Sequence, residues 1–386
     1  MFLMAEEEGF EPSHPVTSLR AFQARPFSRL GIPPNRLILY LKIIYLSLKK
    51  LYIFIVGLNM KEILITNLNK GQRADKFVRK YLNDAPLSFI YKLFRIKDVK
   101  VNDKRIEASY ILKEGDVIKI YVSDQQLADF SKPRTIVKSS VNLKVIYDDQ
   151  NLLIVNKPSG LLIHGDEKEK RITLTNIVLN YLYEKGEYNP SDSAGFIPAP
   201  CHRLDRNTSG IVVYAKNLPS LQQMEALFKE KTQLKKEYLC LVVGKLYGKG
   251  KIDAPLFKDE KKNTVMIKDK AHGGKNALTY YQAKEVYRNC TLVDVNIVTG
   301  RTHQIRVHFA SISHPVLGDS KYGSFTANKN FDAKYKYTGQ FLHAYKLSFY
   351  EIDGHLSYLS NRIFEIDLPE IEKKIIEDLR REVDAN

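Results

Sequence analysis

The chain has 386 residues, 44% hydrophobic and 27% charged, which is an ordinary composition for a soluble globular protein of two or three domains. Lysine and arginine total 60 against 44 acidic residues, so the formal net charge of +16 favours a polyanionic partner, with nucleic acid ahead of an anionic membrane. Three cysteines without a CxxC pair and nine histidines without metal-ligand spacing argue against a disulfide or zinc framework. We therefore expect reduced core thiols at Cys201, Cys240 and Cys290, and a cytoplasmic protein.

Residues 1–59 differ in pattern from the rest of the chain. The apolar run 37–57 is about long enough to span a bilayer, but it contains three lysines, each costing roughly 2.5 to 3.5 kcal/mol near the membrane centre. It also begins too late for a secretory signal and has no small-residue cleavage site. We expect neither a membrane span nor a signal peptide here.

The short stretch GFEP at residues 9–12 is what a string resembling the T-arm of a transfer RNA gene would encode. This suggests that the leader is an upstream extension of the reading frame and that translation starts at Met60. The alternative is a genuine flexible or membrane-touching leader.

Residues 60–125 predict a compact helix, helix, hairpin unit. Apolar residues recur at helical spacing at Ala74, Phe77, Val78, Tyr81 and Leu82. A second helix, with Ser88 as its cap, would bury Ile90, Leu93 and Phe94. Alternating segments at 99–101 and 117–122 predict the hairpin, and the polar residues 126–140 predict a linker.

The polar side of this unit is strongly basic. Its cations are Lys92, Arg95, Lys97, Lys100, Lys104 and Arg105. Charge runs are usually solvated surface. Residues 72–122, however, with RADKFVRKYL and the ending EGDVIKIYV, resemble the RNA-binding domain of the ribosomal protein S-four type. The resemblance implies that these cations dock on RNA phosphates.

Residues 141–380 predict an α+β domain with a mixed, largely antiparallel central sheet flanked by helices. Two apolar strands flank a turn at 148–151, and buried strands are expected at 211–215, 238–243 and 291–298. Helices are expected after Asn217, over a face carrying Ile305 and Phe309, and after Pro369 with Ile371, Ile375 and Leu379 facing inward.

The stretch CHRLDRNTSGIVVYAKN at 201–217 places Asp205 between Arg203 and Arg206. From spacing alone, a salt bridge that stabilises a turn is the commoner explanation. The alternative is a nucleophilic carboxylate kept charged by nearby cations. No phosphate-binding loop, dinucleotide fingerprint, GxSxG elbow or HExxH motif is present, so chemistry without a cofactor remains open.

Four blocks resemble the RluA family of RNA pseudouridine synthases. They are KPSGLLIH at 157–164, HRLDRNTSGIVVYAKN at 202–217, KKEYLCLVVG at 235–244 and TGRTHQIRVHFASISHPVLGD at 299–319. Members of this family detach uracil from ribose, rotate it and rejoin it through carbon five, without cofactor or metal. The resemblance gives Asp205 the role of the catalytic carboxylate that attacks either the ribose or the base.

The same resemblance implies roles for other positions. Tyr238 would stack on the flipped uracil and help to remove the proton at carbon five, and Arg301 would pair with the catalytic carboxylate. Ile305 would form part of the apolar wall, Arg203 would face RNA, and Arg206 would brace the gap that the base leaves.

Five other residues near these motifs are given no catalytic role. His202, Thr208 and Gly210 are expected to shape the loop that presents Asp205, and Arg306 and His308 to contact RNA or stabilise local structure.

The sequence therefore predicts a monomeric cytoplasmic RNA pseudouridine synthase that acts on large-subunit ribosomal RNA or pre-ribosomal particles. Transfer RNA is the alternative substrate. A protein of another class, a non-catalytic RNA-binding factor in ribosome assembly, is a further alternative, and a membrane-attached protein is a third that rests only on residues 37–57.

Overall fold

The computed structural model describes residues 42, 58–131, 139, 141–165, 172–191, 196–230 and 232–384. The expected leader therefore lies outside the described residues, apart from Lys42, Leu58 and Asn59. Within the part of the chain that is described, no helix is both long enough and apolar enough to cross a membrane.

The amino-terminal region contains a four-stranded sheet with three helices among its described residues. Its elements are β1 (Leu58–Leu64), α2 (Ala74–Tyr81), α3 (Leu87–Arg95), β2 (Val99–Val101), β3 (Lys104–Arg105), β4 (Val117–Ser123) and α4 (Asp124–Phe130), and the sheet order is β1-β4-β2-β3. Strand β2 pairs antiparallel with both β3 and β4. The buried faces of α2 and α3 agree with the sequence pattern.

Two details of this region differ from the prediction. The second helix begins at Leu87 with Pro86 at its N-cap, so Ser88 lies inside the helix and is not its cap. Helix α4 occupies the first part of the segment 126–140 that was expected to be a linker. The helix carries two apolar residues, Leu127 and Phe130, within an otherwise polar stretch. Phe130 packs against Phe89 of α3, with ring centroids 5.0 Å apart.

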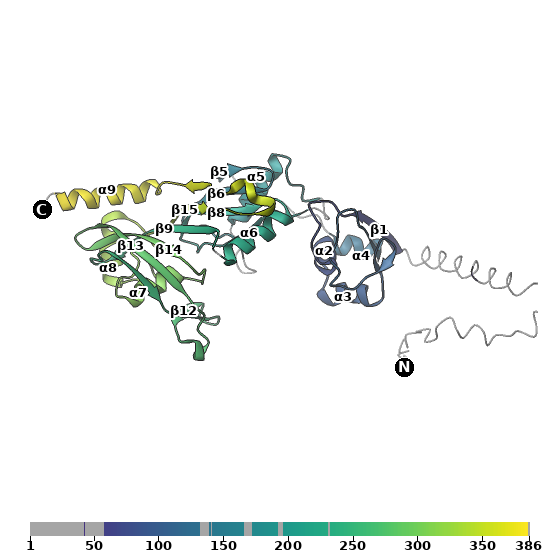
Figure 1. Ribbon diagram of the computed structural model, residues 1–386, viewed down its shortest axis with the longest axis horizontal. Helices are drawn as coiled ribbons and strands as arrows, with labels where there is room; N and C mark the ends of the chain where they lie inside the picture. The colour runs from purple at the N-terminus through teal and green to yellow at the C-terminus, as the bar shows by residue number, and fades with distance from the viewer. Residues whose placement is uncertain are drawn as a thin grey trace, which may run out of the picture. The chain divides into compact units, whose positions relative to one another are not determined.

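The carboxy-terminal region is built on a ten-stranded mixed sheet (Figure 1). Its main path runs β10-β13-β14-β9-β15-β8-β6-β5, with β16 paired to β15 and β7 to β8. The strands are β5 (Lys144–Asp148), β6 (Leu152–Lys157), β7 (Ala199–Pro200), β8 (Ser209–Ala215), β9 (Leu234–Val243), β10 (Lys249–Asp253), β13 (Leu278–Val286), β14 (Cys290–Ile297), β15 (Leu342–Phe349) and β16 (Ile363–Glu365). Only the β8 and β15 pair is parallel among the described pairings, which confirms a mixed, largely antiparallel sheet.

Helices cover this sheet. They are α5 (Leu174–Glu184), α6 (Leu218–Glu230), α7 (Gln304–Ser311), α8 (Phe325–Tyr335) and α9 (Glu370–Asp384), with the short turns η3 (Lys270–His272) and η4 (Gly354–Leu359). A separate hairpin, β11 (Leu256–Asp259) with β12 (Thr264–Ile267), contacts α7.

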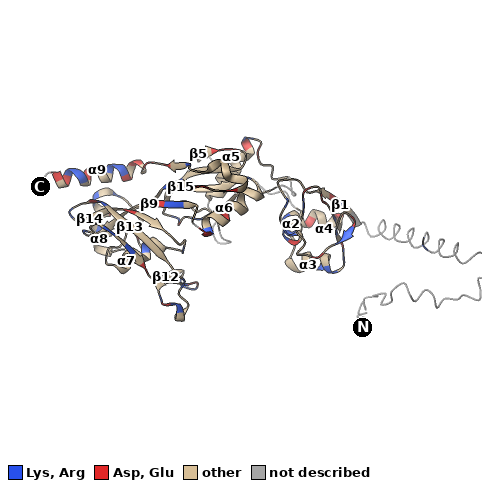
Figure 2. Cartoon of the chain, in the orientation of Figure 1, with Lys and Arg blue, Asp and Glu red and all other residues tan. Residues whose placement is uncertain are grey.

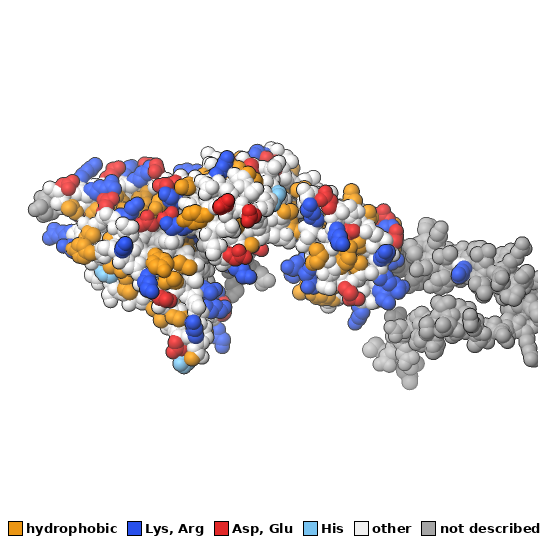
Figure 3. Space-filling view, viewed as in Figure 1, with side chains coloured by type: hydrophobic (Ala, Val, Ile, Leu, Met, Phe, Trp, Pro, Cys, Tyr) orange, Lys and Arg blue, Asp and Glu red, His pale blue; other side chains and the backbone are white. Residues whose placement is uncertain are grey.

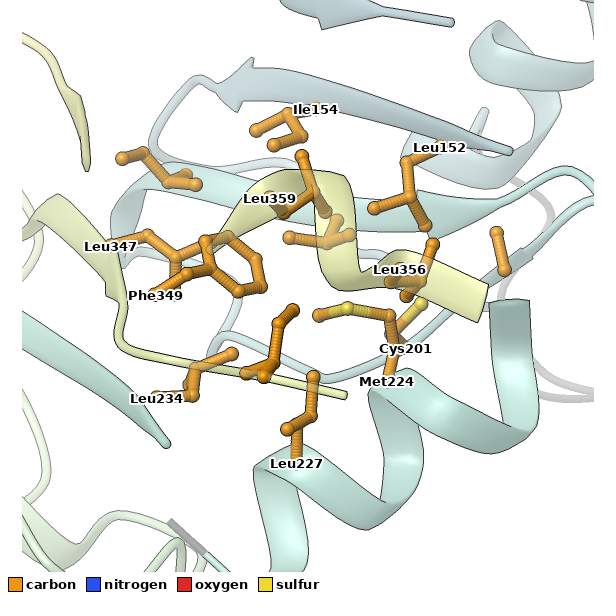
Figure 4. Close-up of a cluster of buried hydrophobic side chains, with 14 residues drawn as sticks. Leu152, Ile154, Cys201, Met224, Leu227, Leu234, Leu347, Phe349, Leu356 and Leu359 are labelled. Carbon is orange, nitrogen blue, oxygen red and sulfur yellow. The ribbon is translucent and has the colours of Figure 1, made fainter. Parts of the chain in front are cut away.

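Strands β6 and β8 are buried on both faces because helices pack on each side. One face meets α6 and η4, where Met224 and Leu227 contact the strands (Figure 4). The other face meets α5 through Leu174 and Val178. This double burial explains why both strands are continuous apolar runs in the sequence.

The other half of the sheet is also covered on both faces. Tyr238 and Ile305 belong to the cluster beneath α7, whereas Ile375 and Leu379 of α9 lie in the cluster on α8. Helix α9 contains both acidic and basic residues along its length (Figure 2). The prediction that Ile371 faces inward is wrong, because its side chain is 48% exposed in the first turn of that helix.

The three cysteines are buried thiols, as expected. Burial raises the pKa of each thiol, and the pKa of Cys290 rises to about 12.

Candidate active site

Asp205 lies in the loop between β7 and β8, at the start of a strand in the middle of the sheet. The loop turns where the backbone N–H of Thr208 donates to the carbonyl of Asp205, at 3.1 Å. Gly210 then has φ +116°, and a Cβ there would lie 2.2 Å from the carbonyl oxygen of Ala344 on β15. Glycine is therefore needed at the point where β8 joins β15, in agreement with the expectation from sequence.

Lys157, at the end of β6, supports this loop from below. Its side chain is fully buried, and its Nζ donates to the carbonyls of Pro158, Leu161 and Arg206 at 2.9, 2.7 and 2.8 Å. Burial lowers the pKa of Lys157, and the nearby Asp205 acts in the opposite direction. Only the ammonium form has three N–H groups for three carbonyls, so this lysine ties the Asp205 loop to the turn after β6.

Arg306 of α7 is the cation that contacts Asp205. Its Nη1 donates to Asp205 Oδ2 at 2.9 Å, while its Nε and Nη2 form a two-pronged contact with Asp319 at 2.6 and 2.8 Å. Asp319 is 1% exposed and also accepts hydrogen bonds from the backbone N–H groups of Lys321 and Tyr322. Arg306 is thereby fixed in direction before it reaches Asp205.

This geometry corrects the expected role of Arg301. Arg301 lies before the first turn of α7, and its Nε donates to the carbonyl of Asn276 at 3.0 Å. Arg306, five residues after Arg301, makes the hydrogen bond to Asp205 that was expected of Arg301. His308 is fully buried, with one ring nitrogen 2.9 Å from Thr279 Oγ1 and the other 2.9 Å from the carbonyl of Ala254, so its role is structural.

Tyr238 and Ile305 form an apolar surface next to this ion pair. Both are about 5% exposed or less and belong to one buried cluster, in which Leu204 also packs. The sheet order brings Tyr238 close to the Asp205 loop, since Tyr238 pairs with Ala344 and Ala344 pairs with Gly210. Burial, with Asp205 as a second cause, raises the pKa of Tyr238 well above its usual value.

His303 adds a group that the sequence did not single out. Its Nε2 lies 3.9 Å from Asp205 Oδ2, and its Nδ1 lies 2.8 Å from the hydroxyl of Tyr322. The ring of Tyr322 also stacks on the guanidinium of Arg306, at 5.1 Å from the ring centre. Imidazole, phenol and guanidinium thus form one packed group around a single carboxylate oxygen.

The two arginines that flank Asp205 in sequence differ in exposure. Arg203 is exposed, whereas Arg206 is partly buried and its carbonyl is held by Lys157. Neither replaces Arg306 as the hydrogen-bonded partner of the Asp205 side chain. Their expected contacts with RNA stay predictions.

The predicted RNA-binding cations lie on α3, β2, β3 and the connecting turns. Five are exposed, namely Lys92, Arg95, Lys97, Lys104 and Arg105, while Lys100 is partly buried with its Nζ 4.9 Å from the ring centre of Tyr121. Basic side chains are visible on the surface of this region in Figure 3.

The site residues that were not expected beside Asp205 from the sequence all lie in or beside the quoted blocks. Lys157 opens KPSGLLIH, His303 and Arg306 lie in GRTHQIR, and Asp319 ends the last block, with Tyr322 three residues later. For Lys157, the sequence did contain a signal, because this lysine ends an apolar strand. A charged residue at such a position is seldom buried without a partner.

Comparison with known proteins agrees with this geometry. Residues 151–311 match the family described as RNA pseudouridylate synthase. A relative from Vibrio parahaemolyticus, "Ribosomal large subunit pseudouridine synthase C", is 37% identical over 72% of this chain and 85% of its own length.

Two further matches cover different shares of the chain. A Bacillus subtilis relative, "Uncharacterized RNA pseudouridine synthase YlyB", is 31% identical over 84% of this chain and 99% of its own length. The solved structure of "Human RNA Pseudouridylate Synthase Domain Containing 4" is 26% identical, with a TM-score of 0.48, over 61% of this chain and 93% of that one.

Proposed function

The chain belongs to the RNA pseudouridine synthase family, isomerases that act on uridine in RNA, and we propose that its substrate is large-subunit ribosomal RNA. Relatives from Vibrio parahaemolyticus and Haemophilus influenzae carry this substrate in their names, at 37% and 35% identity. The observation that supports catalysis most directly is the Asp205 carboxylate held by Arg306 beside the apolar surface of Tyr238. A non-catalytic assembly factor would have no need for this arrangement.

In the proposed reaction, the bond between ribose C1′ and uracil N1 breaks, and a bond between C1′ and C5 forms. The hydrogen on C5 leaves as a proton and N1 gains one, so the RNA keeps its composition. Asp205 is the nucleophile, and Arg306 supplies the positive charge that orients its carboxylate. Tyr238 and Ile305 provide the apolar contact for the flipped base.

The raised pKa of Tyr238 limits what this residue does. Its phenol stays neutral at physiological pH and is a poor base, because burial and Asp205 both oppose the phenolate. We assign Tyr238 to stacking on the base.

We also propose that residues 60–125 bind RNA as a domain of the ribosomal protein S-four type. The exposed cations on α3 and β3 support this, since phosphate contacts place an RNA without reading much of its sequence. Arg203 and Arg206 belong to the substrate-binding side in this proposal, and the protein acts in the cytoplasm as a monomer.

The decisive experiment follows release of tritium from RNA labelled at C5 of uridine. Wild-type protein is expected to release tritium from large-subunit ribosomal RNA, whereas Asp205→Asn lowers the rate by at least about a thousandfold. Equal rates for wild type and Asp205→Asn would contradict the catalytic role of Asp205. Faster release from transfer RNA than from ribosomal RNA would overturn the substrate proposal alone.

A further inference from the structure

His303 adopts a backbone conformation that few residues other than glycine tolerate. It has φ +53° and ψ +19° at the N-cap of α7, yet its side chain makes no capping hydrogen bond. Strained backbone of this kind persists where the surroundings hold it, and it concentrates at functional sites. In this conformation, Nε2 of His303 lies 3.9 Å from Asp205 Oδ2.

The hydrogen bonds around Tyr322 favour one tautomer of His303. The backbone N–H of Val265 donates to the Tyr322 hydroxyl oxygen at 2.9 Å, so this oxygen already acts as an acceptor. The hydroxyl hydrogen is then available to His303 Nδ1, which lies 2.8 Å from the hydroxyl oxygen. A neutral His303 that accepts at Nδ1 must carry its own proton on Nε2, the nitrogen that faces Asp205.

The charges around His303 agree with a neutral ring. Burial is the main cause that lowers the pKa of His303, and Arg306 and Lys321 lower it further, while Asp205 and Asp319 act in the opposite direction. The imidazole is therefore uncharged at neutral pH and serves as a hydrogen-bond donor, not as a second cation.

We propose that His303 is a positioning residue whose Nε2–H closes on Asp205 Oδ2 when RNA binds. Two donors, Arg306 Nη1 and His303 Nε2, then hold one carboxylate oxygen and leave Oδ1 for the nucleoside. Among the described residues, Oδ2 is the oxygen that both groups approach. Catalytic hydrogen bonds are often long before substrate binds and shorten in the complex. The distance of 3.9 Å between His303 Nε2 and Asp205 Oδ2 must shorten in this way for a hydrogen bond to form. This inference rests on the proposed synthase activity.

Two substitutions of His303 distinguish the effect of losing the N–H donor toward Asp205 from the effect of losing the imidazole ring. His303→Gln places an amide N–H near the former Nε2 and keeps a donor toward Asp205. His303→Asn places its amide near the former Nδ1 and removes that donor, while asparagine tolerates the left-handed backbone. His355→Asn is the matched control, since His355 is an exposed histidine on η4.

In the tritium-release assay, His303→Asn is expected to lower kcat about 10- to 100-fold, with KM for RNA within about twofold of wild type. His303→Gln is expected to recover at least about a third of the lost activity on a logarithmic scale, and His355→Asn to match wild type. Wild-type kcat in His303→Asn, or equal losses in the Asn and Gln variants, would overturn the proposal. Inactivity of the wild-type protein would instead refute the synthase assignment on which it rests.

The tautomer of His303 can be measured directly, and a folding defect would not produce the same change in the signal. Nitrogen NMR of the full chain with labelled histidine is expected to show His303 protonated at Nε2, with its signal assigned through His303→Asn. Tyr322→Phe removes the hydroxyl that favours this tautomer, so the Nδ1-protonated form should appear. An Nδ1-protonated ring in wild type, or an unchanged spectrum in Tyr322→Phe, would contradict the proposal.

Discussion

Replacing Arg306 by lysine keeps a positive charge beside Asp205 but removes the planar fork that joins two carboxylates. Arg306 makes two hydrogen bonds to Asp319, at 2.6 and 2.8 Å, and one to Asp205, at 2.9 Å. One ammonium nitrogen on a shorter side chain does not reproduce all three. We expect the lysine to stay with Asp319, which is buried and bears a full charge, and to leave Asp205 without its donor.

The expected loss follows from one charged hydrogen bond, which contributes about 1.5 to 3 kcal/mol. Because each 1.36 kcal/mol corresponds to a tenfold change in rate, kcat should fall roughly 10- to 160-fold. The assay is tritium release from RNA labelled at C5 of uridine, measured at saturating RNA. Thermal unfolding of the same sample shows whether Arg306→Lys is folded at the assay temperature.

Arg301→Lys is the matched control, since Arg301 is also an arginine beside α7 but contacts the carbonyl of Asn276. Its kcat should stay within about twofold of wild type, as for other exposed substitutions. A normal rate for Arg306→Lys together with a large loss for Arg301→Lys would refute the assignment made from the structure and restore the one suggested by sequence resemblance.

Three further substitutions test the supports of the site and of the fold. Lys157→Met removes the donor shared by the carbonyls of Pro158, Leu161 and Arg206 and should cost about 1 to 3 kcal/mol of stability in urea unfolding; an unchanged midpoint would mean that the ammonium contacts contribute nothing net. Gly210→Ala should lose at least about 1 to 3 kcal/mol, because its Cβ would lie 2.2 Å from the carbonyl oxygen of Ala344; wild-type stability would show that β15 moves freely. Burial raises the pKa of Glu372 to about 7, so the folded chain binds this proton more tightly than the unfolded chain, and wild type loses stability as pH rises from about 4.5 through about 7. Glu372→Gln, which keeps an acceptor for Tyr337, should lack this loss and unfold at a higher temperature than wild type at about pH 8; parallel pH profiles for the two proteins would contradict it.

Sequence pattern alone determined the elements around the site. Double burial of β6 and β8 follows from their continuous apolar runs, and the turn before β8 follows from Thr208 and Gly210. Such features depend on local periodicity and on backbone geometry, and both can be inferred from residues that are close together in the sequence. Asp205 and Tyr238 were found through motifs that lie on those same elements.

Contacts between distant segments were decided only by the tertiary structure. Arg301 and Arg306 are five residues apart in one motif, and the sequence did not reveal which guanidinium reaches Asp205. The choice depends on where α7 begins, because Arg301 precedes its first turn while Arg306 projects from the helix toward both Asp205 and Asp319.

Lys157 and His303 illustrate the same limit. A lysine after an apolar strand has no visible partner in sequence, yet folding brings three carbonyls to its ammonium. One tautomer of His303 is favoured by Tyr322, whose hydroxyl itself accepts a hydrogen bond from a backbone N–H of a separate hairpin. Composition and periodicity determined which elements form and which face each buries. The direction in which each polar side chain points depends on its hydrogen-bond partners. Those partners come together only through the order of strands β8, β15 and β9 and through the position at which α7 begins.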